Sequence, residues 1–397
     1  MTDIYKLLFI ISCIGAAKPR IWELAQHFDS FDDMYDVLMS PNAHSYFSPS
    51  EIKAAARTKR QHIEAVSDHC LSNKITILTY DDSRYPDRLR RLLNPPALLF
   101  CKGDVSILKD DVIIAAVGAR KISGYTEKAE TKLVAELASK GITIASGFAA
   151  GADILANRTA VKNGGRTIAV LGSGIGYSYP PENMQYVDEI LKNGVIISEY
   201  FPNASAQLLN FTARNRILAA LSSGIAIMEA SERSGSLNIA QQGQNQGKDI
   251  WVMSVHDITD SRYDGGKELL RSGAFPIYGA EDILGEYFEN TGVRPIKEMT
   301  SDYSILNDKN TGEASDRKPL PKKTAKAPEP IKKETVPELN EIEKTVYDIL
   351  SKSPSPLSAD EISEDSGEDL FEILDVITGL ELRGTILSDD GQTYYLN

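Results

Sequence analysis

The hydrophobic pattern divides the chain into a helical start, a long alternating region and a short terminal segment. Apolar residues up to about residue 72 have helical spacing, broken at Gly15, Pro19, Pro41 and Pro49. From about residue 75, β-branched runs alternate with helix-length segments, the runs being 75–80, 112–117, 142–145, 167–171, 195–198, 225–229 and 250–253. Runs that are apolar on both faces predict a parallel sheet covered by helices on both sides. We therefore predict a helical module over residues 1–72 and a doubly wound α/β domain over 73–290.

The last part of the chain, residues 291–397, is predicted to contain a linker and a small terminal domain. Residues 291–337 form the linker, because 309–337 contains five prolines and almost no large apolar residues. In residues 338–397, helical spacing appears at 341–352 and 369–383, and Ser358 with Glu361 matches a capping box. Two short strands, 385–387 and 393–396, complete a predicted hairpin. Helices followed by a hairpin suggest a winged helix.

The amino-terminal module contains one segment with a second interpretation. Residues 15–30 could form a helix-hairpin-helix element that binds the backbone of duplex DNA. A small packing module explains the same pattern, and we favour it on propensity grounds.

Charge at first argues against a nucleic-acid-binding protein. The chain has 56 acidic against 43 basic residues, a net charge of −13, whereas binding to phosphates relies on Lys and Arg. Residues 338–397 alone hold 15 acidic and three basic residues, so the acidity lies mostly in the terminal domain. Its candidate recognition helix carries Asp369, Glu372, Asp375 and Glu381 against Arg383. We expect this domain to bind protein rather than duplex DNA.

Cysteine and histidine usage excludes several kinds of site. The three cysteines have no CxxC spacing, and of the five histidines one, His256, falls in the α/β region. We therefore expect no disulfide framework, no metal site, no cofactor and no catalytic triad. Residues 7–14 have helical spacing, and Asp3 and Lys6 leave no net positive charge before them, which argues against a signal peptide. No run of about 18 apolar residues occurs elsewhere, so a membrane-spanning helix is not expected. We expect a cytoplasmic protein without a membrane anchor.

Candidate binding residues follow the predicted strands, where open parallel sheets bind ligands. Gly118, Arg120 and Lys121 precede a predicted helix, whose free amides should attract a phosphate. Small residues after the next two strands permit close approach of a ligand; they are Ser146, Gly147, Gly151, Gly172 and Gly174. Asp153 is expected to cap the following helix.

Two further segments carry candidate residues. Phe211, Arg214, Asn215 and Arg216 combine an aromatic ring with two cations, which suits a stacked base and phosphates. Ser234, Gly235 and Ser236 open another helix and could bind an anion or simply cap it. Glu199 and Glu229 each end a strand, and we expect them to accept bonds from loop amides rather than to catalyse.

In combination, these motifs resemble the DNA-processing protein A family (DprA, also called Smf). The resemblance covers about residues 85–274 and rests on VGARK, GITIASGFAAGAD, FTARNRILAALS and EASERSGSL. It implies a Rossmann-like domain that binds single-stranded DNA at Arg120, at Phe211 with Arg214, Asn215 and Arg216, and at Ser234–Leu237. It also implies a homodimer that protects incoming DNA and loads the RecA recombinase in natural transformation, with no catalytic reaction.

Four positions depart from the family pattern. Asn157 replaces the usual His, Ile239 replaces Thr, Ser254 lies within MSV in place of VPG, and Lys267 replaces Asn. We expect these changes to remodel the edge of the pocket. Two alternative functions remain at this point, a nucleotide-processing hydrolase of related fold and a protein-interaction adaptor.

Overall fold

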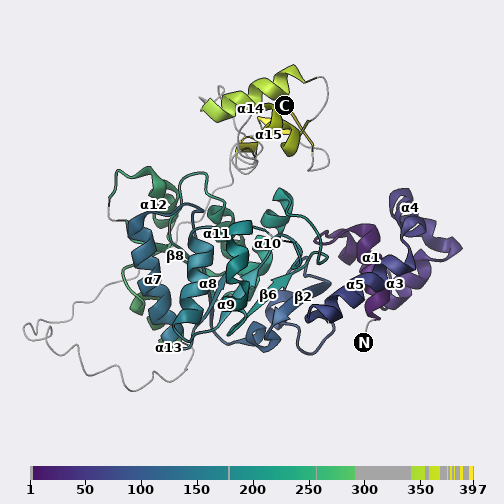
Figure 1. Cartoon of the computed structure of the whole chain (residues 1–397), viewed down its shortest axis with the longest axis horizontal. Helices are drawn as coiled ribbons and strands as arrows, with labels where there is room; N and C mark the ends of the chain where they lie inside the picture. Colours follow the sequence, from purple (N-terminus) through teal and green to yellow (C-terminus); the bar gives the residue numbers. More distant parts are fainter. Residues whose placement is uncertain are drawn as a thin grey trace, which may run out of the picture. The chain divides into compact units, whose positions relative to one another are not determined.

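The computed structural model describes residues 3–177, 179–255, 257–290, 341–353, 357–366 and scattered positions between 373 and 396. The chain forms two compact units, one ending at Glu286 and the other beginning at Tyr287 (Figure 1). The predicted linker over residues 291–337 lies outside the described residues.

Five α-helices form the amino-terminal part of the first unit. They are α1 (Ile4–Ile14), α2 (Arg20–Ala25), α3 (Phe31–Leu38), α4 (Pro49–Arg57) and α5 (Arg60–Ser72). α1 lies at their centre, and its residues Leu7, Leu8 and Ile10 are completely buried. The same hydrophobic cluster continues into Leu98 and Phe100 of the sheet, so the module packs on one end of the α/β domain (Figure 1).

The hairpin between α1 and α2 contacts the α/β domain. The indole Nε1 of Trp22 donates a 2.6 Å hydrogen bond to the carbonyl of Pro95, and Asn94 Nδ2 donates to the carbonyl of Ala17 at 3.1 Å. Lys18 and Pro19 at the tip of the hairpin are exposed. Residues 15–30 thus pack on the α/β domain, and binding of a DNA backbone by the exposed tip stays a prediction.

A nine-stranded sheet forms the centre of the first unit. Its strands are β1 (Ile75–Thr79), β2 (Leu98–Gly103), β3 (Ile113–Val117), β4 (Thr143–Ser146), β5 (Thr167–Val170), β6 (Gly194–Ser198), β7 (Gly224–Ile227), β8 (Asp249–Met253) and β9 (Phe275–Ile277), in the spatial order 1-2-6-5-4-3-7-8-9. The pairs β1–β2 and β2–β6 are antiparallel, and the other pairs are parallel. The fold is thus the predicted α/β class. It contains two strands that the pattern did not indicate, β2 between β1 and β6, and β9 at one edge.

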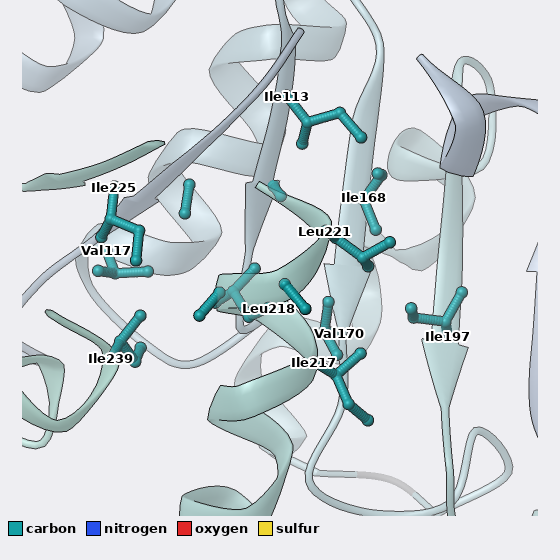
Figure 2. Close-up of a cluster of buried hydrophobic side chains, with 14 of the residues drawn as sticks. Ile113, Val117, Ile168, Val170, Ile197, Ile217, Leu218, Leu221, Ile225 and Ile239 are labelled. Atoms are coloured by element: carbon teal, nitrogen blue, oxygen red, sulfur yellow. The ribbon is translucent and has the colours of Figure 1, made fainter. Parts of the chain in front are cut away.

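Helices cover both faces of this sheet. They are α6 (Asp87–Arg90), α7 (Gly124–Ser139), α8 (Ala152–Lys162), α9 (Val187–Ile190), α10 (Leu208–Leu221), α11 (Ser236–Asn245), α12 (Asp264–Arg271) and α13 (Glu281–Asn290). Ile217 and Leu218 of α10 pack with Ile113, Val117 and Val170 (Figure 2). On the other face, Ile154 and Ile190 of α8 and α9 pack with Ala169 and Ile196. Alternate residues of one strand therefore enter opposite cores, as the doubly apolar runs predicted.

Strand order reverses beside β3. From β3 the chain moves through β4 and β5 to β6, and it then returns to the other side of β3 with β7 and β8. In open parallel sheets the connecting loops separate at such a reversal, and ligands bind there, outside the carboxyl ends of the strands. This place beside the end of β3 is called the crevice below.

The carboxyl-terminal unit contains α14 (Glu341–Lys352), β10 (Leu357–Ser358), α15 (Ala359–Ser366), β11 (Ile386–Leu387) and β12 (Thr393–Leu396). β11 and β12 pair antiparallel, as the sequence predicted. The capping box is also present, because Ser358 N–H donates to Glu361 Oε2 at 2.8 Å and Glu361 N–H donates to Ser358 Oγ at 3.3 Å. The charged residues of the predicted helix over 369–383 lie outside the described residues.

The sheet core predicts a contrast between two leucines of α10. Leu218 is completely buried, whereas Leu209 is 43% exposed. Leu218→Ala should lower the free energy of unfolding by about 2–5 kcal/mol, because it leaves a cavity against the sheet. Leu209→Ala should change it by less than about 0.5 kcal/mol. Urea denaturation of the full chain measures both, and equal losses would contradict the packing described here.

Candidate nucleic-acid interface

The predicted binding residues gather at the carboxyl edge of the sheet. Loops follow β3, β4 and β5 at this edge, and the first turns of α10 and α11 lie beside them. Gly118, Gly147, Gly172, Phe211 and Ser234 all belong to these segments.

The loops after β3 and β4 are in backbone contact. Ala152 N–H donates to the carbonyl of Ala119 at 3.1 Å. Gly151 has φ +75°, and a Cβ there would collide with the carbonyls of Ala119 and Arg120. Gly118 faces the same junction, where a Cβ would lie 2.9 Å from Ala152 Cβ. Glycine is therefore needed at 118 and 151 to join the two loops.

Arg214 lies beneath these loops rather than in the crevice. Its side chain is 4% exposed, and Nη1 donates to the carbonyls of Gly147, at 2.8 Å, and of Val170. Burial lowers the pKa of its guanidinium, an effect that the nearby carboxylate of Asp153 opposes. Arg214 therefore ties the ends of β4 and β5 together.

Asp153 does not cap α8, contrary to the sequence prediction. Gly151 is the N-cap residue, and the Asp153 carboxylate accepts bonds from the Ala149 and Gly147 amides. The Ser146 hydroxyl beside it donates to the Ala116 carbonyl at 2.6 Å. Burial raises the pKa of Asp153, and the charge of Arg214 acts in the opposite direction. Ser146 and Gly147 are thus part of the support for the loop.

Arg216 and Asn215 are also held by protein partners. Arg216 pairs with Glu199 at 2.8 Å and donates from Nε to the Asn94 carbonyl at 3.0 Å. Asn215 accepts from Arg214 Nε at 3.2 Å and donates to Asn238 Oδ1 at 3.0 Å. Glu199 therefore balances an arginine instead of accepting from loop amides.

Phe211 is half-buried against the glycine loop after β5. A Cβ at Gly172 would lie 2.6 Å from the Phe211 ring. Tyr179 meets this ring in an edge-on arrangement, with centroids 5.5 Å apart. Gly174 similarly allows the loop to lie against the backbone of Phe201 and Pro202. The glycines position an aromatic ring whose remaining surface is open.

Arg120 and Lys121 lie on the loop that leaves β3 at the strand reversal. Lys121 is exposed and Arg120 half-buried. The charge of Arg120 contributes to the lowered pKa of Arg214, so two cationic groups interact at this point.

The amide of Ser123, the N-cap residue of α7, bonds to a side chain of the protein. Ser123 N–H donates to Glu229 Oε2 at 2.9 Å, and the Thr126 hydroxyl donates to the same atom at 2.6 Å. The hydroxyl of Tyr263 lies 2.8 Å from that of Ser123. The Ser123 amide is therefore not available to a ligand, and binding of a phosphate by the other amides of this helix start stays a prediction. The prediction that Glu229 accepts from a loop amide is confirmed. No sequence motif indicated the contribution of Tyr263.

The serines at the start of α11 bond to each other. Gly235 is the N-cap residue of α11. The hydroxyls of Ser234 and Ser236 lie 2.7 Å apart, and Ser236 N–H donates to Ser234 Oγ at 3.4 Å. Ser234 thus bonds locally to the amide two residues ahead without capping the helix, and binding of an anion here stays a prediction.

Comparison with known proteins places the chain in a family. Residues 76–288, more than half of the chain, match the family model described as DNA recombination-mediator protein A. The chain belongs to this DprA family. Residues 329–392 match the DprA winged helix domain.

Two DprA-family relatives cover different shares of the chain. A DprA from Bacillus subtilis is 35% identical over 212 residues, which are 53% of this chain and 71% of the relative. Protein Smf of Synechocystis is 30% identical over 391 residues, 96% of this chain and 95% of its own length. The similarity to the second relative therefore spans both compact units.

Two solved DprA structures resemble the fold. DprA from Streptococcus pneumoniae superimposes with a TM-score of 0.62 at 27% identity, covering 72% of this chain and 98% of that one. DprA from Helicobacter pylori gives a TM-score of 0.50 at 31% identity, covering 55% and 98%. The latter structure was described for its mode of binding single-stranded DNA.

Two of the four departures from the DprA pattern point away from the crevice. Asn157 donates to Thr167 Oγ1 at 2.8 Å, at the opposite end of β5, and Ile239 is buried in the sheet core. Ser254 accepts from the Tyr125 hydroxyl at 3.0 Å through its carbonyl, and Lys267 pairs with Asp264. The expected remodelling of the pocket edge does not apply to Asn157 or Ile239.

The described residues offer neither a metal site nor a membrane-spanning helix. They contain no cluster of three His, Cys, Asp or Glu side chains placed to hold a metal ion. None of their helices is both long and apolar enough to cross a bilayer.

Glu130 of α7 is a buried carboxyl that the sequence did not reveal. It has no exposed surface, and neither side-chain oxygen has a partner among the described residues. Burial first, and then the charges of Asp153 and Glu229, raise its pKa well above 4.5. The carboxyl lies under the crevice and costs stability wherever it must be charged.

This cost makes Glu130→Gln a test of the buried cluster. The folded protein holds the proton more tightly than the unfolded chain, so the wild type loses stability as pH rises from about 4.5 through the raised pKa. The variant lacks this loss and should be more stable by about 1–3 kcal/mol at neutral pH. Urea unfolding at several pH values measures the difference. Exposed Glu127→Gln is the control, and a difference that shrinks as pH rises would contradict the assignment.

Proposed function

We propose that the protein binds single-stranded DNA at the carboxyl edge of the β3–β5 region. The observation that carries this proposal is the position of Arg120 and Lys121 at the strand reversal, next to buried Arg214. Cations at this point attract a phosphate backbone, and the half-open ring of Phe211 offers a surface for a base.

The chemistry supports a single strand without sequence preference. Every nucleotide has a phosphate and a base face, and a duplex hides the base faces that Phe211 would contact. The description of the Helicobacter pylori DprA as a single-stranded DNA binder supports the same choice. Arg214, Asn215 and Arg216 act in this proposal as positioning residues, because their side chains are held by protein groups.

The finer role follows from the family. We propose that the protein protects incoming DNA, loads the RecA recombinase and works as a homodimer, without catalysing a reaction. Glu229 is a poor general acid or base, since Oε2 already accepts from Ser123 and Thr126. The acidic terminal domain is proposed to bind protein. AMP hydrolysis that Glu229→Gln abolishes would favour the hydrolase alternative, and RecA binding without DNA binding would favour an adaptor.

Removing the two outer cations tests DNA binding. Arg120→Ala with Lys121→Ala should weaken binding of fluorescent oligo-dT by about tenfold or more. It should also reduce the slope of log affinity against log salt by about 1.4, since each lost contact to a single strand removes about 0.7. Anisotropy across a salt series measures both quantities.

A matched control removes two charges elsewhere. Lys132→Ala with Lys140→Ala removes an exposed lysine in the middle of α7 and the half-buried C-cap lysine at its carboxyl end. This variant should leave affinity and slope unchanged. Wild-type binding by the Arg120 and Lys121 double variant would refute the proposed interface.

A further inference from the structure

A groove runs between α5 and the segment that follows β6. One part, of about 430 Å³, is lined by Arg57, Thr58, His62, Val66 and Phe201 among others. A second part, of about 290 Å³, shares His62, Val66 and Phe201 and continues to His69 and Pro202. The shared residues make the two parts one continuous surface, here called the α5 groove.

The α5 groove reaches the loop that follows β5. A Cβ at Gly176 would lie 3.4 Å from His69 Nε2, and Gly176 N–H donates to the Pro202 carbonyl at 2.7 Å. The same loop holds Gly172, which lies against Phe211. The groove therefore begins where the candidate interface ends.

A basic segment adjoins the groove, and its Arg57 is part of the groove lining. Residues 52–63 contain Lys53, Arg57, Lys59 and Arg60 and no acidic residue. Arg60 pairs with Glu64 at 2.7 Å, whereas Lys53, Arg57 and Lys59 are exposed and make no ion pair within the described ranges. Lys59 precedes α5, whose first turn has no side-chain cap. Arg57 therefore places positive charge on the apolar groove itself, and Lys53 and Lys59 lie on the same chain segment.

We propose that the α5 groove binds the continuation of the DNA strand held at the crevice. Phosphates would lie along Lys53, Arg57 and Lys59, and bases would lie against His62 and Phe201. An apolar floor with a cationic rim suits unpaired nucleotides, because a duplex hides its bases and exposes only its backbone. This inference rests on the proposed function and extends the binding site onto the amino-terminal helical module.

Oligonucleotide length distinguishes this extension from the crevice itself. A strand of about six nucleotides can fill the crevice alone, whereas one of about 20 can also enter the groove. Arg57→Ala with Lys59→Ala should therefore leave binding of the short oligo-dT unchanged. Binding of the long oligo-dT should weaken by about tenfold at low salt, with a loss of about 1.4 from its salt slope. His62→Ala should weaken long-strand binding without changing the slope.

The outcomes separate the inference from the proposed function. Unchanged affinity of the Arg57 and Lys59 variant for the long strand overturns the groove, and so does an equal loss for both lengths. Failure of the wild type to bind either strand overturns the proposed function instead. The variant with Lys132→Ala and Lys140→Ala controls for total charge. Urea midpoints confirm folding, since the substituted side chains are exposed.

Discussion

The candidate interface depends on one buried guanidinium. Arg214 reaches from α10 to the carbonyls that follow β4 and end β5, and it faces the carboxylate of Asp153. Removing either charge would leave the other buried without a partner, which is strongly destabilising. The loops above therefore keep their shape only while this pair is intact, and Gly151 and Phe211 depend on the same arrangement.

The hydrophobic pattern predicted most of the sheet, because buried parallel strands are apolar on both faces. It missed β2 and β9 for different reasons. β2 follows Pro95 and Pro96 and pairs antiparallel with β6, so it lies outside the strand–helix alternation. β9 spans only three residues, and both Phe275 and Pro276 are exposed. Short edge strands depend on a neighbour along the sheet rather than on their own sequence.

The sequence predicted where the candidate residues lie in the sheet, but not which of their side chains are buried. Residues after successive strands do meet at one edge, which follows from topology alone. The burial of these side chains could not be predicted. Arg214 and Arg216 have the residue type and spacing of a phosphate-binding pair, yet Arg214 donates to main-chain carbonyls and Arg216 pairs with Glu199. The burial of Glu130 could not be predicted either, because a glutamate on a helix is usually solvated.

The carboxylate of Glu229 also affects which molecules can compete for the crevice. Dinucleotide-binding proteins of this architecture bind a pyrophosphate at the start of the helix after the first parallel strand. Here the carboxylate of Glu229 already accepts hydrogen bonds from Ser123 and Thr126 at that helix start. A mononucleotide has a single phosphate group, and that group gains little from a helix start whose donors already bond to Glu229. A single strand bound as proposed above adds many weak contacts along its length, and such contacts favour a polymer over free nucleotides.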